Sequence, residues 1–229
     1  MPEIEYVEDR MESEELLERL CPPVRNWFKD KFPDFTEPQK VAIPRILNGE
    51  HLLLCSPTGS GKTLTAFLTI IDDLVRRSLD GSLPDAVQCV YISPIKALAN
   101  DIEKNLLGPL GEIKERYLPS RAKEIKVGLR TGDTPQSERE KMLRKPPHIL
   151  ITTPESMGLG LASKRFRPIL DQMKWFIIDE MHSLVPTKRG THLSLSMALM
   201  DSVVSSDVQR IGISATMEPL DAVAEFLVA

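Results

Sequence analysis

The chain has 229 residues, of which 41% are hydrophobic and 27% are charged, an ordinary composition for a globular protein with a sizeable core. No apolar run approaches the roughly 20 residues that span a bilayer, and the acidic start of the sequence lacks the pattern of a secretion signal, so we expect a cytoplasmic protein without a membrane partner. The net charge of −4 at pH 7 excludes binding of nucleic acid through a globally basic surface, so any such partner must be held locally.

Residues 1–33 are predicted to form a short helical N-terminal extension. One helix is expected over the amphipathic run 13–20 and a second over residues 24–32. Between them, Pro22 and Pro23 are expected to break the chain. Because the pattern changes after this segment, we place a domain boundary between residues 33 and 34.

From residue 34 to residue 229, short apolar runs alternate with helical stretches. Strands are predicted at residues 52–55, 87–92, 127–130, 149–152, 175–179 and 211–214. Helices are predicted at residues 62–77, 95–117, 136–144, 155–162, 192–204 and from 219 to the end. Nearly continuous β-branched runs imply strands buried on both faces, and the alternation implies right-handed parallel crossovers. The sequence therefore predicts a three-layer α/β domain, in which ligands gather at the carboxyl ends of the strands.

A glycine-containing turn, Ser56-Pro-Thr-Gly-Ser-Gly-Lys-Thr63, directly follows the first of these strands and precedes a helix. Gly59 and Gly61 allow the backbone N–H groups to curl around phosphate oxygens, and the helix N-terminus adds its positive dipole end. Lys62 supplies a point charge, and the Thr63 hydroxyl can ligate Mg²⁺. The predicted phosphate-binding residues are Pro57, Thr58, Gly59, Ser60, Gly61, Lys62 and Thr63.

Two adjacent carboxylates, Asp179 and Glu180, end the apolar run that begins at Trp175. Successive side chains at a strand end diverge, so Asp179 can approach the metal while Glu180 orients and deprotonates a water. The alternative is a pair of solvated acids at a strand edge, and the nearby phosphate turn favours the catalytic interpretation.

Further polar residues follow other predicted strands. Ser93-Pro94 and Thr153-Pro154 each supply an N-cap and a proline at the first helical position, which leaves amides free for a nucleic-acid phosphate or simply caps the helix. Lys96, Arg130 and Arg189 can assist such binding, or lie in solvent.

Ser214 and Thr216 offer hydroxyls at the same edge that can bond to His182, although an ordinary turn is the alternative. The basic cluster 139–145 is predicted to be a solvent-facing helix surface.

These residues together resemble the first RecA-like domain of a superfamily 2 helicase of the DExH type, and most closely the Lhr-like (large helicase-related) group. Phe35-Thr-Glu-Pro-Gln39 is similar to the Q motif, residues 56–63 to motif I, and residues 93–101 to motif Ia. The later motifs follow in order, namely Thr131-Gly-Asp133, Thr153-Pro-Glu155, Asp179-Glu-Met-His182, Lys188-Arg-Gly190 and Ser214-Ala-Thr216. Ser56 replaces the first glycine of the general phosphate-loop pattern, as the superfamily form allows, and Met181 is a mild departure.

The resemblance implies a RecA-like P-loop NTPase fold that binds ATP and Mg²⁺, with Phe35 and Gln39 contacting the nucleotide and Gln39 reading the adenine edge. Thr63 and Asp179 are the implied metal ligands. The implied catalytic residues are Lys62, Asp179, Glu180, His182, Ser214 and Thr216. The implied nucleic-acid contacts are Ser93, Pro94, Lys96, Thr131, Gly132, Thr153, Pro154, Arg189 and Gly190.

The resemblance also implies partners. These are single-stranded or partly duplex nucleic acid, with DNA favoured over RNA, and a second RecA-like domain expected to be absent from this chain. Because that domain supplies an arginine finger worth about 10³- to 10⁵-fold in rate, little ATP hydrolysis is expected from these residues alone. The alternatives are an RNA-directed helicase, a P-loop nucleotide switch or small-molecule kinase, and a non-catalytic nucleic-acid-binding module.

Overall fold

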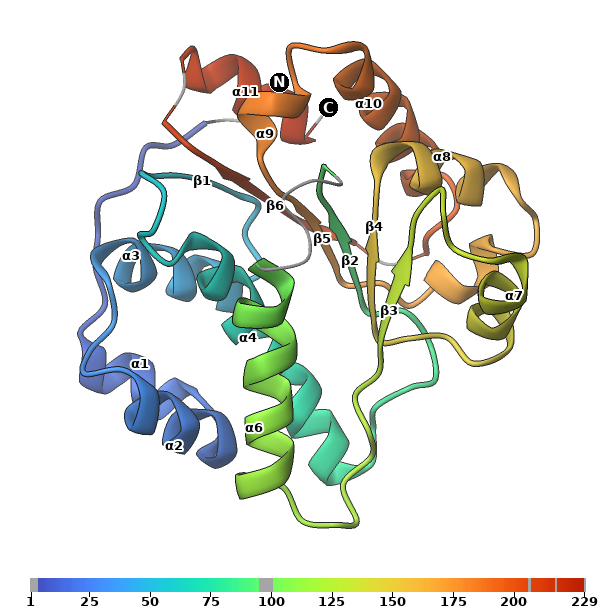
Figure 1. Ribbon diagram of the computed structural model, residues 1–229. Coiled ribbons are helices and arrows are strands. Elements are labelled where there is room, and N and C mark those ends of the chain that lie inside the picture. Colours follow the sequence, from blue (N-terminus) through green and yellow to red (C-terminus); the bar gives the residue numbers. More distant parts are fainter. Residues whose placement is uncertain (1–3, 95–100, 206, 217, 229) are drawn as a thin grey trace.

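A computed structural model describes residues 4–94, 101–205, 207–216 and 218–228 (Figure 1). Within these residues, six parallel strands form one sheet in the order β1-β6-β5-β2-β4-β3. The strands are β1 Leu52–Cys55, β2 Cys89–Ile92, β3 Val127–Arg130, β4 Ile149–Thr152, β5 Trp175–Ile178 and β6 Gln209–Ser214. The predicted α/β fold with a parallel sheet is confirmed.

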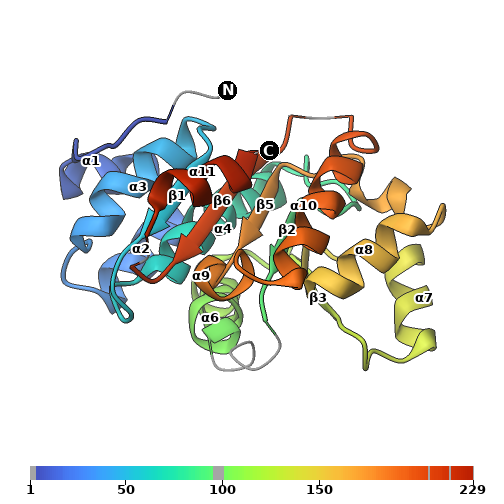
Figure 2. The same cartoon turned by 90° about the horizontal axis from the view of Figure 1, so that it is seen from above.

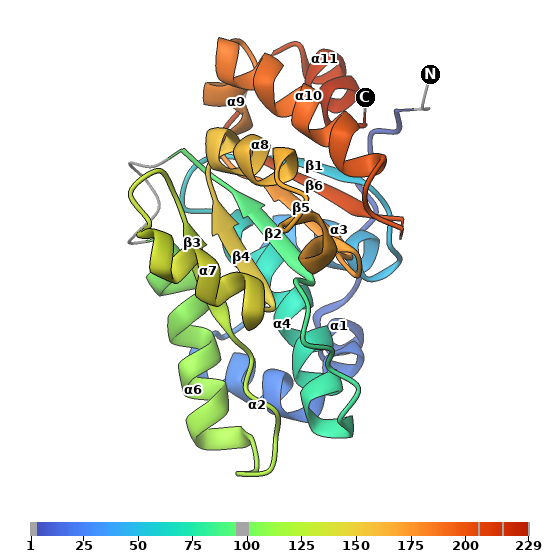
Figure 3. The ribbon, with the colours of Figure 1, turned by 90° about the vertical axis from the view of Figure 1, so that its right-hand side faces the viewer.

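Helices cover both faces of the sheet, which gives three layers (Figure 3). One layer consists of α1 Ser13–Arg19, α2 Pro22–Lys31, α3 Glu37–Leu47, α4 Lys62–Asp80, the π-helical turn η1 Glu103–Leu107 and α6 Gly108–Tyr117. The other consists of α7 Gln136–Arg144, α8 Pro154–Ala162, the 3₁₀ turn η2 Arg167–Leu170, α9 Met181–Leu184, α10 Lys188–Asp201 and α11 Leu220–Val228. No helix among the described residues is both long and apolar enough to cross a membrane.

The central strand β2 explains why the apolar runs are continuous. Cys89 and Tyr91 pack into the hydrophobic core under α4, whereas Val90 and Ile92 pack into the core on the opposite face of the sheet. Successive strand residues point to opposite faces, so a strand covered on both sides must be apolar at every position.

The N-terminal helices α1 and α2 share a core with the α/β domain. Leu16, Val24 and Phe28 are buried in the same hydrophobic cluster as residues of α4. The predicted break between the two helices is present, because Leu20 and Cys21 are extended, but Pro22 and Pro23 themselves form the first turn of α2. Proline is tolerated in the first helical turn because the N–H groups there have no intrahelical partner.

Helix α3 was not predicted, because Pro44 lies inside it. Pro44 has no N–H to donate to the carbonyl of Lys40, four residues earlier. The backbone N–H of Met11 donates to that carbonyl instead, at 3.1 Å. The N-terminal segment thus stabilises helix α3, which the internal proline of that helix disfavours.

The same N-terminal segment also reaches the C-terminal helix α11 (Figure 2). The Tyr6 hydroxyl donates to a carboxylate oxygen of Asp221 in α11, at 2.8 Å. Residues 4–33 are therefore fastened at several points to the rest of the protein, while the domain boundary at residue 34 stays a prediction.

Candidate active site

Three of the predicted motifs meet at one edge of the sheet. Residues 56–61, Asp179 and Ser214 directly follow or end β1, β5 and β6, which are neighbours in the order β1-β6-β5. The strands are parallel, so their carboxyl ends lie on the same side (Figure 1). The Ser56 N–H donates to the carbonyl oxygen of Ser214 at 3.3 Å, which joins the phosphate turn to the end of β6.

The turn before α4 has the backbone that phosphate binding requires. Gly59 and Gly61 have φ values of 83° and 87°, which side-chain-bearing residues rarely adopt. The Lys62 ammonium folds back into the turn and donates to the carbonyl oxygens of Ser56 and Pro57, the latter at 2.7 Å. The first intrahelical bond of α4 runs from Thr65 N–H to the carbonyl of Gly61, at 2.9 Å.

Helix α4 therefore begins with amides that are free to bind a ligand. Those of Lys62, Thr63 and Leu64 precede the first intrahelical bond and donate to no acceptor among the described residues. Free amides at a helix N-terminus, beside a buried ammonium group, fit a phosphate group.

The predicted Q-motif residues contact this turn. The side-chain oxygen of Gln39 accepts the N–H of Thr36 at 2.9 Å, and the Thr36 hydroxyl donates to the carbonyl of Ser60 at 3.0 Å. A Cβ atom at Gly61 would lie 3.2 Å from Gln39 Nε2, so the turn approaches this side chain closely, and the φ of 87° itself favours glycine. Residues 36–39 thus fix the position of the phosphate turn.

A cavity of about 450 Å³ lies beside this contact, and Thr36, Gln39, Gly59 and Gly61 line it. Its aromatic wall comes from α2 and the residue after it. Phe32, 37% exposed, lines the cavity. Phe35, the predicted nucleotide contact, does not line it.

The ring of Phe35 is buried and stacks on Phe28, with centroids 4.0 Å apart. Phe32 is an aromatic residue three positions before Phe35, and this spacing was the signal that could have identified it as a lining residue of the cavity.

Asp179 is held by backbone and side-chain donors at the end of β5. Its side chain is buried, and this burial raises the pKa of the carboxyl to about 6. One oxygen, Oδ1, accepts the N–H of Glu180 at 2.8 Å, and Oδ2 accepts the hydroxyl of Tyr91 in β2. Burial and the nearby Asp179 carboxylate raise the pKa of the Tyr91 hydroxyl, so it remains a donor. Sequence reasoning missed Tyr91.

Glu180 and His182 form a second chain of contacts. His182 Nε2 lies 3.1 Å from Glu180 Oε2, and the His182 N–H donates to Ser214 Oγ at 3.2 Å. His182 Nδ1 accepts the N–H of Ala215 at 3.3 Å, which leaves Nε2 as the ring nitrogen that donates a hydrogen bond to Glu180. The expected contact between His182 and Ser214 is present. Thr216 is exposed and takes no part in it.

The oxygen donors at this edge fit Mg²⁺. Thr63 offers a hydroxyl and Asp179 a carboxylate, and Mg²⁺ prefers oxygen ligands, one or two carboxylates and substrate phosphates. No group of three or more His, Cys, Asp or Glu side chains in the described part of the chain is arranged as a metal cage. Thr63 and Asp179 are therefore the candidate ligands.

The remaining motifs follow the other half of the sheet, β2-β4-β3. Ser93 and Pro94 follow β2, and Thr153 caps α8 by accepting the N–H of Ser156 at 3.3 Å, with Pro154 as the first helical residue. Because these strands are neighbours and parallel, their polar ends lie side by side. Lys96 lies outside the described residues.

The loop after β3 is ordered by a residue that was predicted to face solvent. The Arg139 guanidinium donates to the carbonyls of Thr131, Gly132 and Thr134, at 3.0, 2.8 and 2.8 Å. Arg139 therefore shapes the loop that carries the predicted nucleic-acid contacts Thr131 and Gly132.

Arg189 and Gly190 differ from each other in exposure. The Arg189 guanidinium is bonded to both carboxylate oxygens of Glu155, at 2.5 and 3.2 Å, which joins α10 to α8. Gly190 is buried, and a Cβ there would lie 2.6 Å from the carbonyl oxygens of Leu184 and Val185. Close packing of α10 on α9 thus explains this glycine, and direct contact with nucleic acid is not supported.

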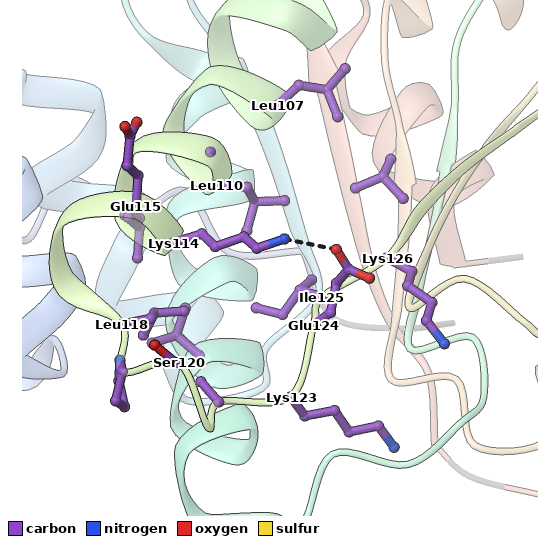
Figure 4. A pocket seen from close by; sticks show the side chains of 16 residues that line it. Leu107, Leu110, Lys114, Glu115, Leu118, Ser120, Lys123, Glu124, Ile125 and Lys126 are labelled. Atoms are coloured by element: carbon purple, nitrogen blue, oxygen red, sulfur yellow. Dashed lines mark hydrogen bonds and ion pairs between the residues drawn. The ribbon is translucent and has the colours of Figure 1, made fainter.

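A larger cavity, of about 810 Å³, lies away from this edge, between α6 and the segment that enters β3 (Figure 4). The ion pair between Lys114 and Glu124, at 2.7 Å, lies among its lining residues. It adjoins the amino end of β3, and no predicted site residue lines it.

Similar proteins agree with this arrangement. The chain is 47% identical to the ATP-dependent helicase Lhr-Core of Methanocaldococcus jannaschii over an alignment of 230 positions. This alignment covers 100% of this chain and 27% of the relative. It is 44% identical to the Lhr helicase and probable uracil glycosylase of Mycolicibacterium smegmatis, covering 92% of this chain and 14% of that protein. The chain thus spans about a quarter or less of the length of these curated relatives.

Solved structures match as well. The helicase Lhr of Mycobacterium smegmatis bound to ssDNA and AMP-PNP gives a TM-score of 0.82 at 44% identity, over 93% of this chain and 27% of that chain. The DEAD-box helicase Mss116 bound to ssRNA and UDP-BeF gives a TM-score of 0.78 at 21% identity, over 96% of this chain and 44% of that chain. At this identity the likeness is one of fold alone. The predicted resemblance to the Lhr-like group is confirmed. Residues 36–224 match the DEAD/DEAH box helicase family, and the chain belongs to that family.

Proposed function

We propose that this chain is the ATP-binding RecA-like domain of an ATP-dependent DNA helicase or translocase. The observation that carries the proposal is the meeting of the phosphate turn, Asp179 and the Glu180–His182–Ser214 contacts at one edge of the sheet. A phosphate turn alone would suit a nucleotide switch or a small-molecule kinase. Those proteins have no need for a histidine that joins the acidic pair to the end of a neighbouring strand.

The residues of this edge take separate roles in the proposal. Lys62 and the free amides at the start of α4 hold the phosphates, and Gln39 and Phe32 contact the base. Mg²⁺ held by Thr63 and Asp179 would neutralise charge on the phosphates. Glu180 orients and deprotonates the attacking water, and the His182 ring holds the Glu180 carboxylate in place.

Nucleic acid is proposed to lie across the ends of β2, β4 and β3. Ser93, Thr131, Thr153 and Arg189 lie at or near this edge, where hydroxyls, amides and a guanidinium can bind phosphates without a basic surface. We favour DNA over RNA because the structure with 44% identity is bound to ssDNA.

Full activity is proposed to need a second RecA-like domain. That domain would supply the arginine finger. Cytoplasmic location, predicted from the sequence, stays a prediction.

Replacement of Glu180 by Gln in the full-length protein, which includes the proposed second RecA-like domain, tests the proposed chemistry, with ATP turnover measured in the presence of single-stranded DNA or RNA of equal length. We expect DNA to stimulate the unmodified protein more than RNA does, and Glu180→Gln to lower turnover about 10²- to 10⁴-fold, because a general base is lost. Nucleotide binding should persist in this variant. Turnover equal to that of the unmodified protein would refute the role of Glu180, and greater stimulation by RNA would favour an RNA-directed helicase.

A further inference from the structure

We propose that Tyr91 is a positioning residue of the ATP·Mg²⁺ site, whose hydroxyl holds the Asp179 carboxylate in the orientation that meets the metal ion. The inference rests on the proposed function, because it concerns the metal that accompanies ATP. It adds a residue that lies outside every motif found in the sequence.

The contact is built into the sheet. Tyr91 lies in β2 and is 1% exposed, and its hydroxyl donates to Asp179 Oδ2. The two residues come from paired strands, in the register Tyr91↔Ile177 and Ile92↔Ile178. The Asp179 N–H also donates to the carbonyl of Ile92, at 2.8 Å. Backbone pairing therefore fixes donor and acceptor relative to each other.

The hydroxyl limits the rotation of the carboxylate. A carboxylate offers about four lone-pair sites, and here Glu180 N–H occupies one on Oδ1 while Tyr91 occupies one on Oδ2. With both oxygens bonded, the group cannot turn freely about its bond to Cβ. The remaining lone pairs are available to a cation or its water, and hydrogen bonds of this kind to a metal ligand tune metal affinity.

The ring of Tyr91 also links the two parts of the nucleotide site. It packs against Phe67 of α4, with ring centroids 4.9 Å apart. Helix α4 begins at Lys62, so a single side chain contacts both the phosphate-binding helix and the acidic residue of β5. Removal of the hydroxyl alone leaves this ring contact in place.

The protein offers a matched control, because each of its three tyrosines donates to an aspartate. Tyr117 donates to Asp30 at the exposed surface, and Tyr6 donates to Asp221 there. Tyr117→Phe therefore removes the same kind of hydrogen bond as Tyr91→Phe, away from the candidate site.

The test is the Mg²⁺ dependence of nucleotide binding, measured with a fluorescent ADP analogue, first in EDTA and then with rising MgCl₂. We expect Tyr91→Phe to raise the half-saturating Mg²⁺ concentration about 10-fold or more, because loss of a partner of a metal ligand costs about 10- to 100-fold in affinity. Binding in EDTA should be unchanged, and Tyr117→Phe should behave like the unmodified protein. In the background Asp179→Asn, Tyr91→Phe should cause no further change.

Equal Mg²⁺ dependence in Tyr91→Phe and Tyr117→Phe would overturn the proposal. A further loss in the Asp179→Asn background would also overturn it, because Tyr91 would then act by another route. If the unmodified protein itself bound nucleotide without any response to Mg²⁺, the proposed function would fail together with this inference.

A second measurement covers the case in which Tyr91→Phe does not fold. The unmodified chain labelled with 3-fluorotyrosine should give a ¹⁹F signal for each tyrosine, assigned through Tyr6→Phe and Tyr117→Phe. We expect the Tyr91 signal to move when Mg²⁺ is added to the ADP-bound protein, while the other two stay in place. A Tyr91 signal that does not respond to Mg²⁺ would contradict the proposal.

Discussion

Glu180 combines the proposed chemistry with an unfavourable backbone. Its φ of 53° and ψ of 42° lie in the left-handed region, at a cost of roughly 1 to 2 kcal/mol for a residue with a side chain. This conformation lets the chain leave β5 and enter α9 within two residues, Asp179 and Glu180. Asp179 can then face Tyr91 while Glu180 faces His182. Such strain is retained where the surrounding structure fixes it, and here it separates two acidic side chains.

His148 illustrates a different cost at the residue scale. Its ring is fully buried, and Nδ1 accepts the N–H of Lys126 at 2.9 Å. Burial lowers the pKa of His148 to about 4. In the unfolded chain the pKa is about 6.5. The folded state therefore binds this proton less readily than the unfolded state.

The free energy of unfolding should accordingly decrease as the pH is lowered below about 6.5. The unfolded chain gains a proton between pH 6.5 and 4 that the folded state does not, which costs about 2 kcal/mol between pH 7 and pH 5. His148→Asn keeps an acceptor near Nδ1 but cannot titrate, so this part of the loss should vanish. Urea unfolding of the unmodified protein and of His148→Asn, at pH 7 and at pH 5, measures this loss of unfolding free energy. Equal losses in the two proteins would argue against a neutral, buried His148.

At the scale of elements, helix α4 joins the candidate site to the N-terminal extension. It starts with Lys62 at the phosphate turn and contacts Tyr91 through Phe67. Further along, Asp72 is 2% exposed and accepts the backbone N–H of Cys21 at 2.6 Å, at the start of α2. The extension is thereby held by the same helix that presents the free amides of the candidate phosphate site.

Replacement of Asp72 should show how strongly the extension is held. Asp72→Ala leaves the buried N–H of Cys21 without its acceptor, which should lower the free energy of unfolding by about 2 to 3 kcal/mol. Asp73→Ala is the matched control, because Asp73 is the next residue and also pairs with an arginine four positions later, but its side chain is 32% exposed. The control should cost less than about 1 kcal/mol. Equal losses in urea unfolding would contradict the proposed anchoring.

Sequence patterns predicted where strands lie, but they did not predict helix α3. The runs 52–55, 127–130 and 149–152 match β1, β3 and β4. Burial on both faces explains the continuous apolar run of β4, whereas β3 lies at an edge of the sheet and is partly exposed. Helix α3 was missed because the bond that compensates for Pro44 comes from Met11, which is distant in sequence.

Local motifs likewise located most of the site but not the residues that support it. The phosphate turn, the acidic pair and the contact of His182 with Ser214 follow from local sequence and strand order. Tyr91 and Arg139 could not be found this way. Their roles depend on which strand pairs with which, and on how a helix packs on a loop.

At the scale of the whole molecule, the carboxyl edge of the sheet is proposed to be divided between nucleotide and nucleic acid. Strands β1, β6 and β5 carry the phosphate turn, Ser214 and Asp179, whereas β2, β4 and β3 carry the proposed nucleic-acid contacts. The boundary runs between β5 and β2, where Tyr91 meets Asp179. This order places the proposed nucleotide half of the edge next to the proposed nucleic-acid half.

The most direct test of the nucleotide site is calorimetric titration of the protein with ATP and Mg²⁺, compared with Lys62→Ala. Lys114→Ala is the control, because Lys114 pairs with Glu124 at the other cavity. We predict that the unmodified protein and the control bind equally and that Lys62→Ala binds about 10- to 100-fold more weakly, because a hydrogen bond to a charged group is lost. Equal affinity in all three proteins would contradict the assignment of this edge as the ATP site.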